Sequence, residues 1–132
     1  MKQLFPILVF LLIGFSSYSQ TDSIVGKKFQ LTGRIIEKVQ MTPHCGIIAW
    51  GTVIEFQIID LVGLTYPNKN IGVIVTCPEF YKDNFFERGK TYQVVFSDKN
   101  QAGFGWTIPN KELLSKNSIP FEPYVVSIKK LP

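Results

Sequence analysis

An alternation of apolar and polar residues, interrupted by one glycine, constrains the fold of this chain most strongly. From Phe29 to Met41 apolar residues fall at every second position except at Gly33 and Glu37, with polar residues such as Gln30 and Thr32 between them. Successive side chains of a β-strand point to opposite faces, so this period predicts a half-buried strand. Gly33 stands in the middle of the pattern, where a missing side chain permits a bend or bulge. A curved β-structure is therefore expected.

Five segments have strand patterns, namely 30–40, 47–61, 71–77, 91–98 and 124–131. The side chains predicted to face the core are Phe29, Leu31, Ile35, Val39 and Met41, then Ile48, Trp50, Ile54, Phe56 and Ile58, then Tyr92, Val94 and Phe96, and finally Tyr124, Val126 and Ile128. Glu55 and Gln57 fall on the opposite face of the second segment. Pro67, Asn68 and Asn70 are typical turn residues between the second and third strands.

A short helix is expected between the third and fourth strands. Thr76-Cys77-Pro78-Glu79 matches a capping box, in which the threonine hydroxyl and the glutamate satisfy amides at the helix start. Tyr81 and Phe85 lie four residues apart and are predicted to face the core together. Gly89 suits the left-handed residue that ends a helix. A second helix of one or two turns is predicted near residues 110–116.

The predicted order is strand, strand, strand, helix, strand, long connection, strand, which is typical of an OB-like Greek-key barrel. FQLTGRIIEKVQ, GTVIEFQIID, NIGVIVTCPEF, ERGKTYQVVF and YVVSIKKL resemble the five strand segments of small OB-like modules. The resemblance points to the secreted branch with disulfides, the netrin-like modules and tissue inhibitors of metalloproteinases. The chain lacks their first cysteine after the leader, so their inhibitory wedge is not carried over. Another small antiparallel barrel or a β-sandwich is the alternative fold.

The first nineteen residues have the layout of a secretory signal. Lys2 gives a positive start, residues 4–15 are apolar, and Ser17 and Ser19 occupy the small positions before a cleavage point. Cleavage after Ser19 leaves residues 20–132 as a single domain, exported to the periplasm or the extracellular space. The apolar run of 12 residues is shorter than the about 20 that span a bilayer, so no membrane span is expected after cleavage.

Charge argues against a nucleic-acid ligand. Without Lys2 the chain has 13 basic and 10 acidic residues, and the basic ones are scattered, whereas nucleic-acid binders cluster them on one face. The predicted ligand is therefore a protein, peptide or glycan of the cell envelope or outside the cell. The protein is predicted to be a monomer.

His44 and Cys45 are adjacent, and His44 is the only histidine. A cysteine nucleophile needs a base within hydrogen-bond reach, but neighbours in an extended chain point to opposite faces. Pro43 and Gly46 flank the pair, which leaves a turn open. A metal site made by His44, Cys45 and Cys77, with Glu79, is a weak candidate because the spacing lacks the close ligand pairs of structural zinc sites. No metal and no cofactor are expected.

A disulfide between Cys45 and Cys77 is the favoured alternative. An exported chain meets an oxidising compartment, and two cysteines have one possible pairing. Two free, buried thiols are the second possibility. A redox role for Cys77 at a helix start lacks a resolving cysteine, since position 80 is phenylalanine.

Aromatic residues of the connections are the candidate binding residues. Phe104 and Trp106 lie in the long connection after the fourth strand, which forms one wall of the ligand groove in OB folds; Tyr66 lies in the turn after the second strand. A cap over the barrel end is the alternative role. The sequence therefore predicts a non-catalytic binding module; an OB-type nucleic-acid or oligosaccharide binder and a small metal- or Cys/His-dependent enzyme are the alternatives.

Overall fold

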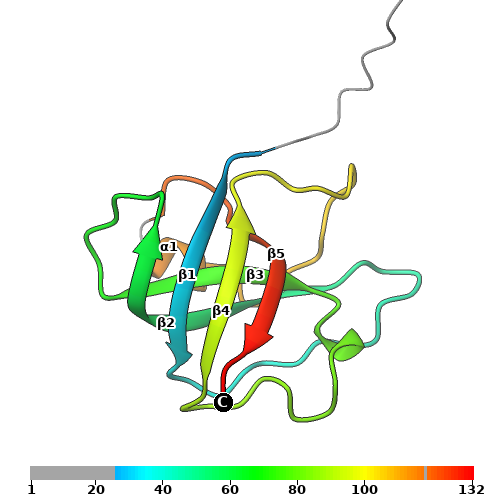
Figure 1. Ribbon diagram of the computed structural model, residues 1–132. Coiled ribbons are helices and arrows are strands. Elements are labelled where there is room, and N and C mark those ends of the chain that lie inside the picture. The colour runs from blue at the N-terminus through cyan, green and yellow to red at the C-terminus, as the bar shows by residue number, and fades with distance from the viewer. Residues whose placement is uncertain (1–25, 118) are drawn as a thin grey trace, which may run out of the picture.

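A computed structural model describes residues 26–117 and 119–132, which fold into a small β-barrel (Figure 1). Its elements are β1 (Lys28–Ile35), β2 (Gly51–Val62), β3 (Asn70–Thr76), the 3-10 turn η1 (Pro78–Phe80), β4 (Thr91–Ser97), α1 (Glu112–Lys116) and β5 (Tyr124–Lys130). The predicted signal segment and its cleavage point lie outside the described residues. Within these residues, no helix combines the length and the hydropathy that a bilayer crossing requires.

The strands close into a barrel in the order β1-β2-β3-β5-β4. β1 pairs antiparallel with β2 on one side and with β4 on the other. β5 pairs antiparallel with the other edge of β4. The barrel closes where β3 meets β5 in parallel, at Ile74 and Tyr124; the Ile74 amide donates to the Pro123 carbonyl at 2.8 Å. The predicted mainly β, five-stranded OB-like barrel is confirmed.

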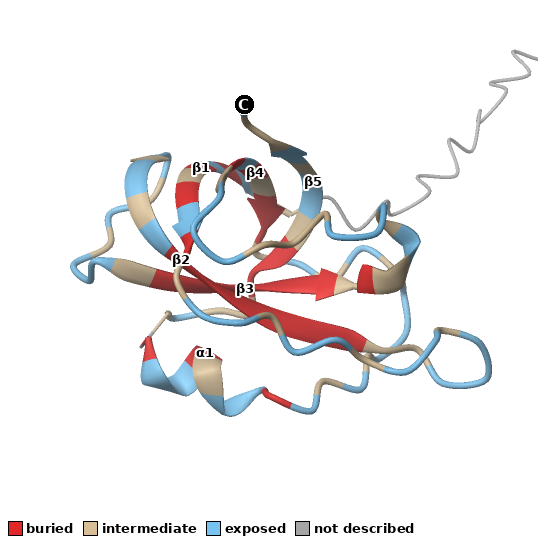
Figure 2. Cartoon of the chain, turned by 90° about the horizontal axis from the view of Figure 1, so that it is seen from below, coloured by how far each residue is buried: buried red, intermediate tan, exposed pale blue. Residues whose placement is uncertain are grey.

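The apolar side chains of the strands fill the barrel interior. Its buried residues are Phe29, Leu31, Ile35, Ile54, Phe56, Ile71, Val73, Val75, Tyr92, Val94 and Phe96. Figure 2 marks the buried residues in red along the strands. The Tyr92 hydroxyl lies 2.5 Å from the Phe85 carbonyl and accepts from the Glu87 amide at 2.8 Å. The large tyrosine therefore keeps its polar end satisfied at the edge of the core.

Gly33 lies at a bulge, as the sequence predicts. Thr32 pairs with Asp60 and Gly33 with Ile58, so Ile59 of β2 has no partner on β1. A Cβ at Gly33 would come within 2.8 Å of the Phe56 Cβ atom. The close approach of β1 to β2 at this bend therefore requires glycine.

The prediction for the inward face of β5 is wrong at Val126, which is 42% exposed. Val95 pairs with Ser127 and Phe96 with Val125, so Val126 is an extra residue at a second bulge. A bulge shifts the side-chain alternation by one position. Val125 packs against the core in its place, and Ile128 packs there as predicted.

The first two strands are shorter than predicted. β1 ends at Ile35 because its partner β4 begins only at Thr91; beyond that point the Gly89 amide closes the ladder by donating to the Ile35 carbonyl at 2.7 Å. Residues 36–50 form a loop, so Met41 and Ile48 are exposed rather than in the core.

The helix predicted between β3 and β4 is reduced to η1, and the capping box does not form. Cys77 precedes η1 with a left-handed φ of 44°, and no side chain caps the turn. The Glu79 side chain bonds to the loop 36–50 instead. Tyr81 and Phe85 still stack, with ring centroids 5.0 Å apart, and pack against the core. The predicted helix within residues 110–116 is confirmed as α1.

A second apolar cluster lies outside the barrel, where α1 covers β2 and β3 (Figure 2). Val53, Ile74, Leu114 and Tyr124 form its buried part. Glu55, predicted to be solvent-facing, is 6% exposed under this cover. Its carboxylate accepts from Lys116 Nζ at 3.3 Å and from Asn117 Nδ2 at 3.4 Å, which compensates for the loss of water around a buried charge.

Candidate functional site

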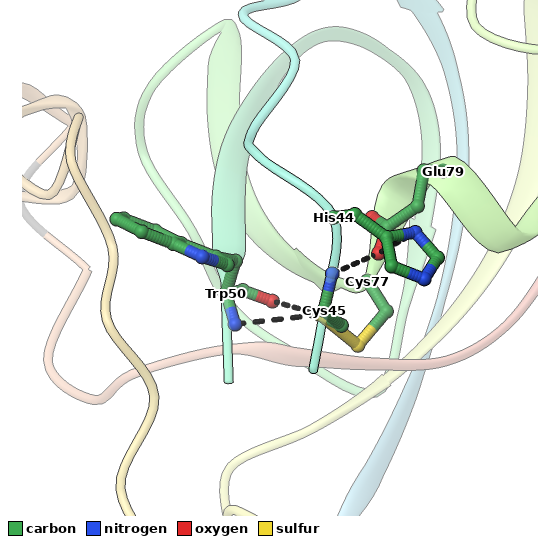
Figure 3. Close-up of a disulfide and its surroundings, with 5 residues drawn as sticks. All are labelled: His44, Cys45, Trp50, Cys77 and Glu79. Carbon is green, nitrogen blue, oxygen red and sulfur yellow. Dashed lines mark hydrogen bonds and ion pairs between the residues drawn. A yellow bond between two sulfur atoms is a disulfide. The ribbon is translucent and has the colours of Figure 1, made fainter. Parts of the chain in front are cut away.

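The Cys45–Cys77 disulfide ties the loop 36–50 to the end of β3 (Figure 3). The two Cα atoms are 5.7 Å apart. The Cys77 amide donates to the Trp50 carbonyl at 2.9 Å, one step beyond the β2–β3 ladder. Cys45 reaches Cys77 because the chain turns back between Cys45 and Trp50. The predicted disulfide is confirmed.

Main-chain and carboxylate groups surround the disulfide (Figure 3). The Trp50 amide donates to Cys45 Sγ at 3.4 Å, and Glu79 Oε1 accepts from the Cys45 amide at 2.5 Å. His44 Nδ1 lies 3.6 Å from the same Glu79 oxygen. The His44 ring also contacts Phe80 edge-on, with centroids 5.7 Å apart. His44 itself is 77% exposed.

With both sulfurs in one bond, Cys45 has no thiol to act as a nucleophile. The turn that brings His44 near Glu79 leaves the histidine pointing toward the carboxylate (Figure 3). The other contact of its ring is with Phe80. In this oxidised form the pair therefore lacks the nucleophile–base contact that covalent catalysis requires.

Of the weak metal candidates, Cys45 and Cys77 converge with Glu79, and His44 lies outside this group. One ligand atom each of Cys45, Cys77 and Glu79 lies within 4.8 Å of the other two, and His44 Nδ1 adjoins the carboxylate. Glu79 Oε2 and Thr42 Oγ1 are buried, and neither has a hydrogen-bond partner among the described residues. Buried polar atoms are nearly always paired, so the Glu79 carboxylate has unused capacity to accept from a proton donor or to bind a cation.

The predicted binding residues Phe104 and Trp106 form a pair in the β4–β5 connection, with ring centroids 5.0 Å apart. Phe104 is 55% exposed. Trp106 is half-buried against the outer apolar cluster, and its Nε1 donates to Asn100 Oδ1 at 3.0 Å. The same Asn100 oxygen accepts from the Ala102 amide at 3.0 Å. Asn100 thus fixes the loop that presents both rings.

A β-bridge joins this connection to the loop 36–50. The Thr107 amide donates to the Ala49 carbonyl at 2.8 Å, and the Gly51 amide donates to the Thr107 carbonyl at 3.0 Å. Ile47 and Ile48 precede the bridge residue Trp50 in the sequence; Ile47 is fully exposed and Ile48 is 47% exposed. We call Ile47, Ile48, Phe104 and Trp106 the apolar loop surface. Sequence reasoning placed Ile48 in the core and missed Ile47; the flanking Pro43 and Gly46 were the available signal of a turn.

Tyr66 lies apart from this surface, at the opposite end of the β2–β3 hairpin. Its hydroxyl is 2.7 Å from the Asn70 carbonyl and 2.6 Å from the Asn117 carbonyl. These contacts anchor the turn to the end of α1. A binding role for Tyr66 stays a prediction.

The outer face of β2 and β3 is occupied by the chain itself. Residues 107–117 cover it through Asn110, α1 and Asn117. Lys111, a neighbouring basic residue, pairs with Glu122 at 2.5 Å. This hydrogen bond lowers the pKa of the Glu122 carboxyl below its ordinary value. An OB-type ligand lying across these strands would have to displace this cover.

Comparisons of the chain with protein-family models, with characterised proteins and with solved structures each gave no match. The barrel and its disulfide thus define the class of protein, a mainly β, OB-like barrel.

Proposed function

We propose that this protein is an exported, non-catalytic interaction module that contacts its partner through the apolar loop surface. The observation that supports this most directly is the exposure of large apolar side chains on two loops joined by one bridge: Ile47 is fully exposed and Phe104 is 55% exposed. Single exposed apolar residues are common, but a group of them on adjoining loops is typical of an interaction site.

The loops that carry this surface are braced. The disulfide fixes the loop 36–50 near Cys45, and the Trp50–Thr107 bridge joins it to the β4–β5 connection. Asn100 and Asn110 fix the connection on either side of this bridge. A preorganised surface loses less conformational entropy on binding, which favours affinity.

Export is part of the same proposal. A disulfide persists in oxidising compartments and is rare in the cytosol. The leader pattern of residues 1–19 supports the same location. A monomeric state and a protein or peptide partner from the envelope or the exterior complete the proposal.

A glycan is the second candidate ligand. Trp106 lines a small depression together with the amide side chains of Asn100 and Gln101. OB folds include oligosaccharide binders, and a partly exposed indole beside amide groups suits a sugar ring. Nucleic acid is less favoured, because α1 covers the β2–β3 face and Lys111 is paired.

Site-specific photo-crosslinking tests the proposal. A photoreactive residue is placed at Ile47 or at Phe104 of the full chain, expressed with its leader and irradiated in its native envelope. Exposed positions on the barrel wall, Gln30 and Lys129, serve as matched controls. We expect discrete crosslinked products from the two loop positions and not from the controls. Equal crosslinking at all four positions, or none at the loops, would contradict the proposal.

A further inference from the structure

We propose that the Cys45–Cys77 disulfide is the oxidised form of a zinc site, completed after reduction by Glu79 and His44. Three side chains of zinc-binding type meet at one corner of the barrel, with one ligand atom each of Cys45, Cys77 and Glu79 within 4.8 Å of the other two. The His44 ring lies outside this group but adjoins it, with Nδ1 3.6 Å from the Glu79 carboxylate. These residues come from two segments, the loop 36–50 and the turn η1 with the residue before it. In the oxidised form each sulfur is bonded and uncharged, so the corner offers no thiolate to a metal.

The separations among Cys45, Cys77 and Glu79 are near those around a tetrahedral ion, and the exposed His44 ring has to move toward the sulfurs to complete the site. With Zn–N and Zn–O distances of about 2.0–2.1 Å, an imidazole nitrogen and a carboxylate oxygen lie about 3.4 Å apart around zinc. The His44 Nδ1–Glu79 Oε1 separation is 3.6 Å. Two thiolates at about 2.3 Å from zinc lie about 3.8 Å apart. After the S–S bond is broken, the two sulfurs therefore have to move apart to this distance, which rotation of the cysteine side chains allows. The carboxylate atom and both sulfurs already lie within 4.8 Å of one another.

Two features of the surroundings favour this state over a plain pair of thiols. The buried Glu79 Oε2 has no hydrogen-bond partner in the described part of the chain, so the carboxylate has acceptor capacity that the oxidised form does not use. The Trp50 amide points at Cys45 Sγ at 3.4 Å, and an N–H donor of this kind stabilises a thiolate ligand. Two thiolates with one nitrogen and one oxygen select zinc among the common divalent ions.

The chemical step balances with a dithiol reductant. The reductant transfers two electrons and two protons, the Cys45–Cys77 bond breaks, and the reductant becomes a disulfide. Zinc binding then releases the two thiol protons to solvent. The disulfide and the zinc ion are thus alternative cross-links of the loop 36–50, and the redox state of the two cysteines determines which one is present.

Metal titration of the protein comprising residues 20–132 tests the inference. The protein is reduced with a phosphine that is then removed, and Zn²⁺ or Co²⁺ is added without oxygen. We expect one equivalent to bind the reduced protein, with the thiolate-to-cobalt charge-transfer band of a tetrahedral site, and none to bind the oxidised protein. Glu79→Gln and His44→Ala are each expected to weaken binding by at least roughly 10-fold, because loss of even an outer-shell partner of a metal ligand costs about 10- to 100-fold. Glu37→Gln, an exposed acid of the same loop, is the control and should not change affinity.

A doubly substituted Cys45→Ser/Cys77→Ser protein should bind no metal. If the reduced chain loses its barrel, far-ultraviolet circular dichroism should show that one equivalent of Zn²⁺ restores it in the wild-type protein and not in Glu79→Gln. The inference is overturned if the reduced protein neither binds Zn²⁺ nor regains its fold with it. It is also overturned if Glu79→Gln and His44→Ala bind as tightly as the wild-type protein, since two thiols alone would then account for binding.

Discussion

Asn110 pairs with both main-chain polar groups of Val53. Its side-chain oxygen accepts from the Val53 amide at 2.9 Å, and its side-chain nitrogen donates to the Val53 carbonyl at 2.9 Å. β1 pairs with β2 only from Phe56 onward, so Val53 lies on an open edge of β2. Asn110 therefore takes the place of a missing strand and attaches the β4–β5 connection, with its exposed aromatic residues, to the barrel.

Replacing Asn110 by alanine should destabilise the protein. Asn110 is 3% exposed, and the substitution leaves the Val53 amide and carbonyl without partners. Each buried polar group left unpaired costs about 1–3 kcal/mol, so we expect a loss of roughly 2–4 kcal/mol in the free energy of unfolding, measured with chemical denaturant. Ser115→Ala, on the exposed side of α1, is the control and should change stability by less than about 0.5 kcal/mol. An Asn110→Ala protein as stable as the control would show that the β2 edge needs no partner.

A Cβ atom at Gly33 should disturb the bend of β1. The added atom would come within 2.8 Å of Phe56 Cβ and 3.2 Å of the Gln57 carbonyl oxygen. Overpacking of this kind costs about 1–3 kcal/mol, so Gly33→Ala should lower the thermal midpoint. A Cβ atom added at Gly105 would meet no other atom within 4 Å, and the φ of Gly105 is not positive; Gly105→Ala should leave the midpoint unchanged. Equal effects of the two substitutions would argue against the close approach at the bulge.

Tyr124 should ionise last among the tyrosines whose pKa is raised. Burial, together with the hydrogen bond to Glu122 at 2.9 Å and the charge of that carboxylate, raises the pKa of Tyr124 to about 12. The pKa of Tyr124 in the folded protein lies above the ordinary value near 10. The contribution of the neutral Tyr124 side chain to the free energy of unfolding is therefore fully present below pH about 10 and is lost as the pH rises toward about 12. Ultraviolet titration of the phenolates should show a step near pH 12 that Tyr124→Phe removes.

Glu122→Gln provides the matching test of cause. It removes the carboxylate charge beside Tyr124 but leaves the ring buried, so the last ionisation should move to lower pH and stay above the ordinary tyrosine value. Circular dichroism across the same pH range separates ionisation from unfolding. A Tyr124→Phe protein that keeps the late step would assign it to another tyrosine.

Removing the disulfide should loosen the loop 36–50 and lower stability. Cys45 and Cys77 are separated by 32 positions, and closing a loop of that length contributes about 3–4 kcal/mol. The Cys45→Ala/Cys77→Ala protein should lose that amount in denaturant unfolding, and hydrogen exchange should rise in residues 36–50 more than in β4. A loss below about 1 kcal/mol would mean that the bond contributes little to holding the loop.

The strand order and most of the core could be predicted because they depend on local patterns. The alternation at Leu31, Ile54, Phe56 and Val94 is present in the sequence, and each of these residues is buried. The errors in the predicted core arise where the pairing between two strands, and not the pattern within one strand, sets which way a side chain points. Val126 was misplaced because a bulge is set by the pairing of β4 with β5, which a single segment does not contain.

The site was predictable in its chemistry and not in its geometry. The number of cysteines and the leader pattern were enough to predict the Cys45–Cys77 bond. The contact of Glu79 with the Cys45 amide depends on a chain reversal between Cys45 and Trp50, and on the left-handed Cys77 that ends β3. For the same reason the predicted capping role of Glu79 was wrong: its carboxylate accepts a hydrogen bond from the Cys45 amide of the loop instead.

The bond that braces the apolar loop surface can be tested directly by mass spectrometry of the protein recovered from outside the cytoplasm, alkylated before and after reduction. We expect a chain beginning at Gln20, two hydrogen atoms lighter than its reduced form. It should gain no alkyl group until it is reduced, and a single disulfide-linked peptide should contain Cys45 and Cys77. Alkylation of both cysteines in the unreduced, exported protein would contradict the braced surface on which the proposed function depends.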